Sequence, residues 1–342
     1  MNSLEKRIKA LSSLGRHLKL YSSENEEYKT LHQLVKKASV QNGWFTEAAI
    51  CETFKQWGEA LNEEKIQKWV STYRFLNDQP KKTVALILAG NIPLVGFHDL
   101  ICVWISGNRS MVKCASKDTL LLPYLMQFLD DFIQEKSCFF TNDQLTNFDA
   151  VIATGSNNAA RYFDHYFSKY THIIRKNRNG VAVLTGEESK EHLEALGRDI
   201  LQYFGLGCRN VAHIFIPKNF DLNLIFGGLY PLAFVIEHSK YANNYDYNKA
   251  VYLMSDFDFL DNGFMLLRES DILSAPIACL HYSYYENVEL LKIKLEKQKE
   301  AIQCLVSNLP LKNALAFGTT QQPELWDYAD NVDTLQFLID LP

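Results

Sequence analysis

Apolar residues recur at three- and four-residue steps through the first part of the chain, which is the spacing of amphipathic helices. The clearest helix is predicted over residues 2–20, and a second lies near 25–40. The apolar positions that share one face of the first helix are Leu4, Ile8, Leu11, Leu14 and Leu18. A broken pattern follows over 45–73, where Trp57 and Trp69 are expected in the core. This section predicts a helical segment that leads into the main fold.

The pattern changes at Pro80, from helical spacing to short continuous apolar runs. Residues 83–89 read Thr-Val-Ala-Leu-Ile-Leu-Ala, as expected for a strand buried on both faces of a parallel sheet. Similar runs predict further strands at 108–114, 148–153, 172–175, 181–184 and 211–217. Helical stretches separate them at 94–106, at 120–133, from 157 or 158 onward, and at 191–204. Strands that alternate with helices predict an α/β fold with a parallel sheet.

The last third of the chain is expected to continue in the same way. We predict a helical stretch over 222–236, strands at 249–254 and 276–282, and a long helix over 289–306. A polar, Tyr- and Asn-rich loop is expected over 241–248. Residues 314–330 are rich in turn-forming and aromatic residues, and their pattern by itself predicts no function.

Composition narrows the class of protein. The chain has 342 residues, enough for two domains, and a net charge of −5, so we expect neither nucleic-acid nor membrane partners. The first 20 residues lack the apolar core of a signal peptide, and no run approaches the ~18 residues of a membrane span. The seven cysteines show no disulfide or zinc spacing, which predicts reduced thiols in the cytoplasm and no metal site.

One cysteine stands on a predicted turn between a helix and a strand. Gly205 is expected to end the helix, and Gly207 to give the backbone the freedom for a tight turn. Cys208 would then lie at the mouth of a cleft, and the cation of Arg209 would favour its thiolate. Cys208 is therefore the candidate nucleophile, the alternative being a small buried thiol.

Other candidate residues follow the ends of predicted strands. Asn91, Lys113 and the pair Gly155 and Ser156 each fall at a strand carboxyl end, where parallel sheets bind ligands. No Gly-x-Gly-x-x-Gly fingerprint is present. The competing interpretations are a turn for Asn91, a solvated strand end for Lys113 and a plain helix cap for Ser156.

The order of four short motifs resembles that of the aldehyde dehydrogenase superfamily. The motifs are Gly90-Asn91-Ile92-Pro93, Gly107-Asn108 to Val112-Lys113, Ala153-Thr154-Gly155-Ser156 and Gly207-Cys208. The closer resemblance is to the long-chain acyl-CoA reductase (LuxC-like) branch, with which residues 175–184 and 322–328 also agree. It covers roughly residues 80–342. It implies a Rossmann-type parallel sheet domain and a second α/β catalytic domain, with the helical segment leading in.

The resemblance also implies roles for these residues. Cys208 would be the nucleophile, and Asn91 would donate its amide to the oxyanion together with the Cys208 backbone N–H. Lys113 would contact the adenosine ribose or a 2′-phosphate of the cofactor, NADPH or NADH. Gly155 and Ser156 would lie against the dinucleotide phosphates at a helix N-terminus.

Two departures from the family pattern qualify the activity that it implies. Hydrolytic aldehyde dehydrogenases carry a water-activating Glu in a Glu-Leu-Gly-Gly motif, and the matching stretch, 179–182, has no carboxylate. Its absence suits exchange of an acyl group with coenzyme A and reduction to the aldehyde. The family's second Glu, which orders the nicotinamide ribose, has no clean match; Glu269 or Asp271 could serve.

We therefore expect an acyl-CoA reductase that acts through an acyl-Cys208 thioester. The alternatives are a short-chain acylating aldehyde dehydrogenase, an acyl-phosphate reductase, or a non-reducing acyl-relay or scaffold subunit. A partner acyl-protein synthetase and a homo-oligomer are compatible with the resemblance. The expected division of the chain is a helical segment at 1–79, a nucleotide-binding domain at 80–205, a catalytic domain at 206–310 and a C-terminal segment at 311–342.

Overall fold

The computed structural model describes residues 3–75 and 80–342. Contacts divide the chain into two compact units: residues 1–176 with 324–342, and residues 177–323. The expected limit after residue 79 adjoins residues 76–79, outside the described residues. The four-part functional division stays a prediction, because compact units are defined by contacts and not by what each part binds.

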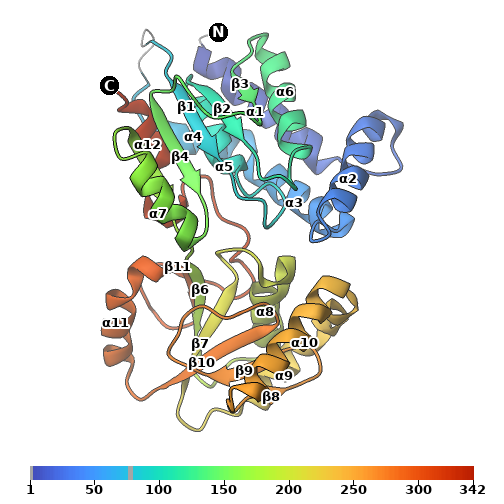
Figure 1. Cartoon of the computed structure of the whole chain (residues 1–342), viewed down its shortest axis with the longest axis vertical. Helices are drawn as coiled ribbons and strands as arrows, with labels where there is room; N and C mark the ends of the chain where they lie inside the picture. The colour runs from blue at the N-terminus through green and yellow to red at the C-terminus, as the bar shows by residue number, and fades with distance from the viewer. Residues whose placement is uncertain (1–2, 76–79) are drawn as a thin grey trace. The chain divides into compact units, whose positions relative to one another are not determined.

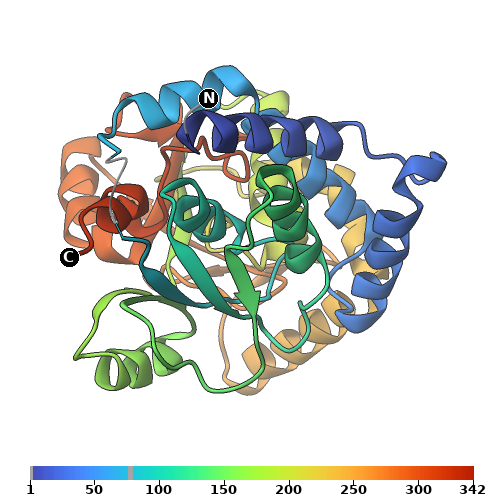
Figure 2. The same ribbon diagram turned by 90° about the horizontal axis from the view of Figure 1, so that it is seen from above.

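Four helices open the first unit, where the periodicity predicts two helices and then a broken pattern. They are α1 (Ser3–Lys19), α2 (Lys29–Gln41), α3 (Glu47–Ala60) and α4 (Glu63–Ser71). Side-chain caps start two of them: Thr46 accepts from the Ala49 N–H before α3, and Asn62 accepts from the Lys65 N–H before α4. α1 packs against α3, α4 and α6 (Figure 2).

A five-stranded, all-parallel sheet forms the centre of this unit, in the order β3-β2-β1-β4-β5 (Figure 1). Its strands are β1 (Thr83–Ile87), β2 (Arg109–Lys113), β3 (Cys138–Phe140), β4 (Ala150–Thr154) and β5 (Thr171–Arg175). The connecting helices are α5 (Phe97–Ile105), α6 (Leu121–Ile133) and α7 (Asn157–Tyr166), and α12 (Thr334–Ile339) closes the chain. The sequence pattern predicted each of these strands except the three-residue β3.

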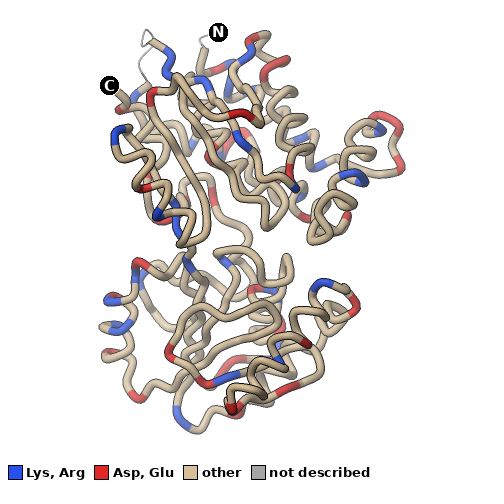
Figure 3. Tube along the Cα trace, viewed as in Figure 1, with Lys and Arg blue, Asp and Glu red and all other residues tan. Residues whose placement is uncertain are grey.

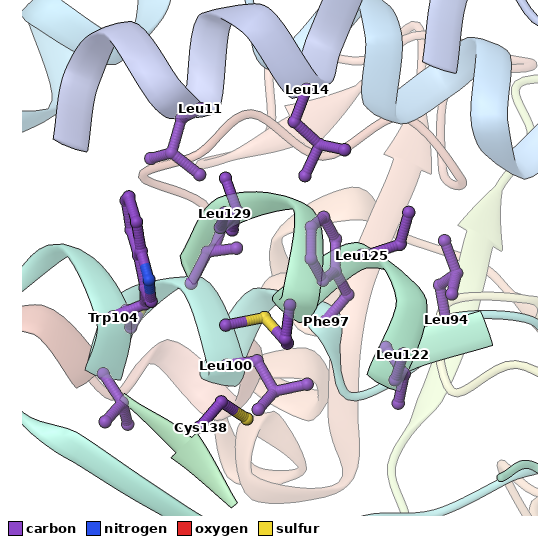
Figure 4. Packing of buried hydrophobic residues seen from close by; sticks show 14 of the residues in the cluster. Leu11, Leu14, Leu94, Phe97, Leu100, Trp104, Leu122, Leu125, Leu129 and Cys138 are labelled. Atoms are coloured by element: carbon purple, nitrogen blue, oxygen red, sulfur yellow. The ribbon is translucent and has the colours of Figure 1, made fainter. Parts of the chain in front are cut away.

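Both faces of this sheet are covered, as the continuous apolar run of β1 predicts. Val84 and Leu86 face a core shared with α5, α6 and the N-terminal helices, whereas Ala85 faces a second cluster that includes Phe167. Figure 4 shows Leu11 and Leu14 of α1 lying over Leu125, Leu129, Phe97 and Trp104. The helical segment therefore shares a core with the sheet.

The second unit holds a seven-stranded sheet in the order β12-β11-β6-β7-β10-β9-β8, parallel except between β8 and β9. The strands are β6 (Asn179–Val183), β7 (Val211–Pro217), β8 (Leu260–Asp261), β9 (Leu266–Glu269), β10 (Cys279–Tyr285), β11 (Ile302–Ser307) and β12 (Ala314–Leu315). The helices are α8 (Lys190–Leu201), α9 (Asn223–Leu229), α10 (Ser239–Met254) and α11 (Val288–Lys297).

Four expectations for this unit are wrong. The loop expected over 241–248 and the strand expected over 249–254 both belong to α10. The helix expected over 289–306 ends at Lys297, and its last part is strand β11. The helix expected over 191–204 ends at Leu201.

None of the described helices is both long and apolar enough to cross a membrane. Lys and Arg are interspersed with Asp and Glu along both units (Figure 3).

Candidate active site

The carboxyl edge of the first sheet brings together the predicted strand-end residues. Lys113, the last residue of β2, pairs in register with Ile87 of β1, and Ile87 pairs on its other side with Ala153 of β4. The loop after β1 carries Asn91, and the loop after β4 carries Gly155 and Ser156. Lys113 itself ends β2, between them in the chain. The strand order reverses between β1 and β4, which is where open α/β sheets bind nucleotides.

The loop after β1 runs as a bend and a turn into α5. Asn91 lies half-buried in the bend, and Leu94 adopts a left-handed φ of 57° in the turn that follows. Asn91 thus lies in a chain reversal, as its competing interpretation predicts. Its role as a hydrogen-bond donor to the oxyanion stays a prediction.

The turn between β4 and α7 joins the strand end closely to a capped helix N-terminus. Ser156 is the N-cap of α7, and its hydroxyl accepts from the Ala159 N–H at 3.2 Å. A Cβ on Gly155 would come within 2.8 Å of the Ala159 Cβ and 3.0 Å of the Phe163 ring. Only glycine therefore lets the strand end meet the helix N-terminus this closely, and the residues fit a dinucleotide phosphate.

Cys208 lies in the second unit, in the turn between α8 and β7. α8 gives way at Leu201 to a short 3-10 turn in which Tyr203, Phe204 and Gly205 all have positive φ. The left-handed backbone is thus found at 203–205, whereas Gly207, which was expected to need it, is not among the positive-φ residues. Cys208 is exposed and is not in a disulfide.

Asn210 fixes this turn, and the sequence analysis missed it. Its side-chain oxygen accepts from the Gly207 N–H at 2.8 Å, and its amide donates to the carbonyls of Asp199, Ile200 and Gln202 at the end of α8. Asn210 is 3% exposed, so these bonds are shielded from water. An Asn two residues after the cysteine is the only sequence signal, and it does not reveal the partners.

The cation beside Cys208 is already engaged. The Arg209 side chain donates through Nε to the Thr320 carbonyl, and the Arg209 carbonyl accepts from the Cys304 thiol at 3.4 Å. Arg209 is therefore held by its neighbours, and its effect on the thiolate stays a prediction.

The amino end of β6 lies directly beside the Cys208 turn. The Gly180 N–H donates to the Asn210 carbonyl at 3.0 Å, and a Cβ on Gly180 would come within 2.6 Å of the Arg209 carbonyl oxygen. Residues 179–182, which have no carboxylate, thus adjoin the turn that carries Cys208.

Glu269 and Asp271, the two candidates for the family's second Glu, lie at and just after the end of β9 in this unit. Glu269 is the exposed last residue of β9 and pairs in register with Tyr282 of β10, itself opposite Ile214 of β7. Asp271 forms an ion pair with Lys294 at 2.6 Å, which holds the pKa of Asp271 below its usual range. A role for either in ordering the nicotinamide ribose stays a prediction.

Among the described residues, no group of three or more His, Cys, Asp or Glu is arranged to hold a metal ion.

The chain has an aldehyde-dehydrogenase-like fold, as solved structures show. Aldehyde dehydrogenase 21 from Physcomitrella patens, in complex with its product succinate, aligns over 99% of this chain and 84% of its own, with a TM-score of 0.68 at 12% identity. The indole-3-acetaldehyde dehydrogenase AldA of P. syringae, a mutant in complex with NAD+ and IAA, aligns over 91% and 73%, with a TM-score of 0.66 at 12% identity. Aldehyde dehydrogenase C from Pseudomonas syringae, a mutant complexed with NAD+ and octanal, aligns over 93% and 79%, with a TM-score of 0.64 at 14% identity.

No protein-family model matches the sequence, and no curated protein matches it. The likeness is therefore one of fold, and the activity has to be argued from the site.

Proposed function

We propose that this chain reduces a long-chain acyl-CoA to the aldehyde, with NADPH or NADH as hydride donor and an acyl thioester on Cys208 as the intermediate. The proposal joins the aldehyde-dehydrogenase-like fold to the LuxC-like motifs of the sequence. Two of the structural neighbours are NAD+ complexes, which supports a nicotinamide cofactor here.

The observation that carries the proposal is the contrast between Cys208 and the other cysteines. Burial raises the pKa of all six others, to about 12 for Cys114, Cys138 and Cys304 and to about 11 for Cys279. A thiolate is the reactive form of cysteine, so the five of these that are buried or half-buried are poor nucleophiles, whereas Cys51 is exposed. Cys208 is exposed, on a turn that Asn210 holds in place.

In the proposed reaction the Cys208 thiolate attacks the thioester carbonyl. The amide of Asn91 donates to the oxyanion that forms, and the C–S bond to coenzyme A then breaks, leaving the acyl group on Cys208. A bound reduced nicotinamide supplies the hydride for the acyl carbonyl. Reduction of the thioester carbonyl would leave a thiohemiacetal anion on Cys208, and its C–S bond would break to release the aldehyde and the Cys208 thiolate. Replacing Asn91 by Ala would lower the rate by ~10²–10³.

The carboxylate-free stretch beside the turn supports reduction over hydrolysis. No Asp or Glu stands at 179–182, next to the Cys208 turn, to activate water against the acyl-enzyme. The thioester would then survive long enough to accept hydride. The acyl group would come from free acyl-CoA or from a partner acyl-protein synthetase.

The proposal predicts a covalent acyl-enzyme that can be weighed. After incubation with myristoyl-CoA and no nicotinamide, the intact mass should rise by one acyl group, and NADPH or NADH should discharge it as the aldehyde. Cys208→Ala should show no shift, and Cys51→Ala, which removes the other exposed thiol, should behave as wild type. An adduct that neither cofactor discharges would contradict the reductase and indicate a relay. Equal labelling of Cys208→Ala would exclude Cys208 as the nucleophile.

A further inference from the structure

The end of α2 lies against the carboxyl edge of the first sheet. Asn42, the C-cap residue of α2, donates from its N–H to the Ala38 carbonyl at 2.9 Å, and its side-chain oxygen accepts from the Trp44 N–H at 3.1 Å. Its side-chain amide donates to the Gly90 carbonyl at 3.0 Å. One buried side chain, 3% exposed, therefore connects the N-terminal helices to the residue before Asn91.

The preceding residue reaches the next loop along the same edge. The Gln41 amide donates to the Ser116 carbonyl at 3.2 Å and to the Thr119 hydroxyl at 3.0 Å. Both acceptors lie in the loop that follows Lys113. Two consecutive side chains thus hold the two loops that leave β1 and β2.

The two loops also touch one another. A Cβ on Gly90 would come within 2.7 Å of the Ala115 Cβ and 3.1 Å of the Asp118 Cβ. Such an approach leaves little room for either loop to move independently of the other.

The helix that carries these two residues is itself well anchored. Leu31, Val35 and Ala38 of α2 are buried in the core of the first unit, and Phe45 follows in the same core. Because α2 is fixed in the core, the hydrogen bonds of Gln41 and Asn42 restrain the loops that they reach.

We propose that Gln41 and Asn42 are positioning residues: Asn42 sets the loop that carries Asn91, and Gln41 sets the loop that follows Lys113. The kinetic part rests on the proposed function. Neither side chain touches substrate. Asn42 acts through the oxyanion donor, which matters only in the transition state, and Gln41 acts through the cofactor loop.

Substitutions of the two residues should therefore change different kinetic constants. Asn42→Asp keeps the acceptor for the Trp44 N–H but turns an oxygen toward the Gly90 carbonyl, so kcat should fall about 10- to 100-fold with KM for acyl-CoA little changed. Asn42→Ala, which adds no buried charge, should show the same split. Gln41→Glu should raise the KM for the cofactor several-fold and leave kcat nearly unchanged.

Asn62 provides a matched control in the same helical segment. Its amide donates to the Glu59 carbonyl at 3.0 Å and its oxygen accepts from the Lys65 N–H at 2.9 Å, so both of its bonds are local and reach neither loop. Asn62→Ala should lose the same two types of bond and retain the wild-type kcat. An equal loss of kcat in Asn62→Ala and Asn42→Ala would overturn the positioning role.

A readout that needs no activity separates this inference from the proposed function. Hydrogen exchange at the amides of 88–96 should accelerate at least about tenfold in Asn42→Ala and stay at the wild-type rate in Asn62→Ala. Unchanged exchange in Asn42→Ala would overturn the inference, even in an active enzyme. If exchange responds as expected but the wild-type chain makes no aldehyde, the proposed function fails and the positioning of the loop stands.

Discussion

The carboxyl group of Asp118 is held away from water in the loop after β2. The residue is 3% exposed, and among the described residues neither carboxyl oxygen has a hydrogen-bond partner. Burial raises the pKa of Asp118 to about 7. The folded chain thus keeps a proton on this group where the unfolded chain, with a carboxyl pKa of about 3.9, has lost it.

This difference makes the first unit less stable as the pH rises. The cost is absent below about pH 4, grows between pH 4 and 7, and is full above pH 7, where it reaches on the order of 4 kcal/mol. Asp118→Asn cannot ionise, so its stability relative to wild type should rise by a similar amount between pH 4 and 8. Urea denaturation at both pH values measures this, and a pH-independent difference would contradict it.

At the residue scale the sequence predicted where a residue lies in an element better than which residues it forms hydrogen bonds with. A helix cap was the competing interpretation for Ser156, and Ser156 is the N-cap of α7, because a Ser before a helix can accept from a free backbone N–H. Asn42 and Asn210 were missed as structural ties, because their partners lie 48 residues away in one case and across a helix end in the other. Local spacing contains no record of such contacts.

The error at α10 has a physical cause in the type of residue that it buries. Its buried positions, at helical spacing, are Tyr241, Tyr245, Asn248 and Tyr252. Each places a polar atom on a partner; for example, the Tyr241 hydroxyl donates to the Phe264 carbonyl and the Asn248 amide to the Ile277 carbonyl. If tyrosine is counted as polar, this face shows no apolar periodicity and the helix is not predicted. In the structure the tyrosine rings pack as an apolar stripe.

The error at β11 arose from a shared period. Ile302 continues the spacing of the apolar residues in α11, so the helix seemed to extend to 306. The chain instead turns at 298–301 and pairs β11 with β6 in parallel, which is a long-range contact that periodicity cannot reveal. By contrast, β1, β2 and β4 are buried on both faces or stop at clear turn residues, and their prediction is confirmed.

One buried arginine joins the C-terminal segment to the first sheet. Arg175, at the end of β5, makes a two-pronged ion pair with Asp99 at 2.7 and 3.2 Å and donates to the Ala329 carbonyl and the Thr334 hydroxyl. Burial opposes its charge, yet Asp99 holds the pKa of Arg175 above its usual value.

Arg175→Met should destabilise the first unit by about 3–5 kcal/mol, because it leaves the Asp99 carboxylate buried without its partner. The adjacent Lys176→Ala is the control. Lys176 is exposed, its pair with Asp164 at 3.2 Å lies in water, and its loss should cost less than about 1 kcal/mol. Urea denaturation followed by tryptophan fluorescence compares them, and equal costs would refute the role of Arg175.

On the scale of the whole molecule, Asp118 in the first unit and His213 in the second shift stability in opposite directions as the pH falls. His213 of β7 donates through Nδ1 to the Ile272 carbonyl at 3.2 Å, and its Nε2 lies 3.0 Å from the Ser283 hydroxyl, which can donate to the neutral ring. Burial lowers the pKa of His213 to about 4. The second unit should thus lose stability as the pH falls from about 6.5 to 4, by on the order of 3 kcal/mol.

The tryptophans allow the units to be followed separately. All five lie in the first unit (Trp44, Trp57, Trp69, Trp104 and Trp326), so fluorescence follows that unit alone, while circular dichroism follows both. Between pH 7 and 5 the dichroism transition should gain a component at lower urea that fluorescence does not show. In His213→Asn, which cannot be protonated, most of this acid-sensitive component should disappear. An identical pH response in the variant would exclude His213 as its source.

The division of the chain also sets an order of events during synthesis. Residues 177–323 leave the ribosome before residues 324–342, so the second unit can complete its sheet while the first still lacks its last segment. Asp99 is present early, but Ala329 and Thr334, which also accept from Arg175, are translated after the whole second unit. A nascent chain halted before residue 324 would therefore hold a finished second unit and a first unit whose buried arginine still lacks two of these four hydrogen bonds.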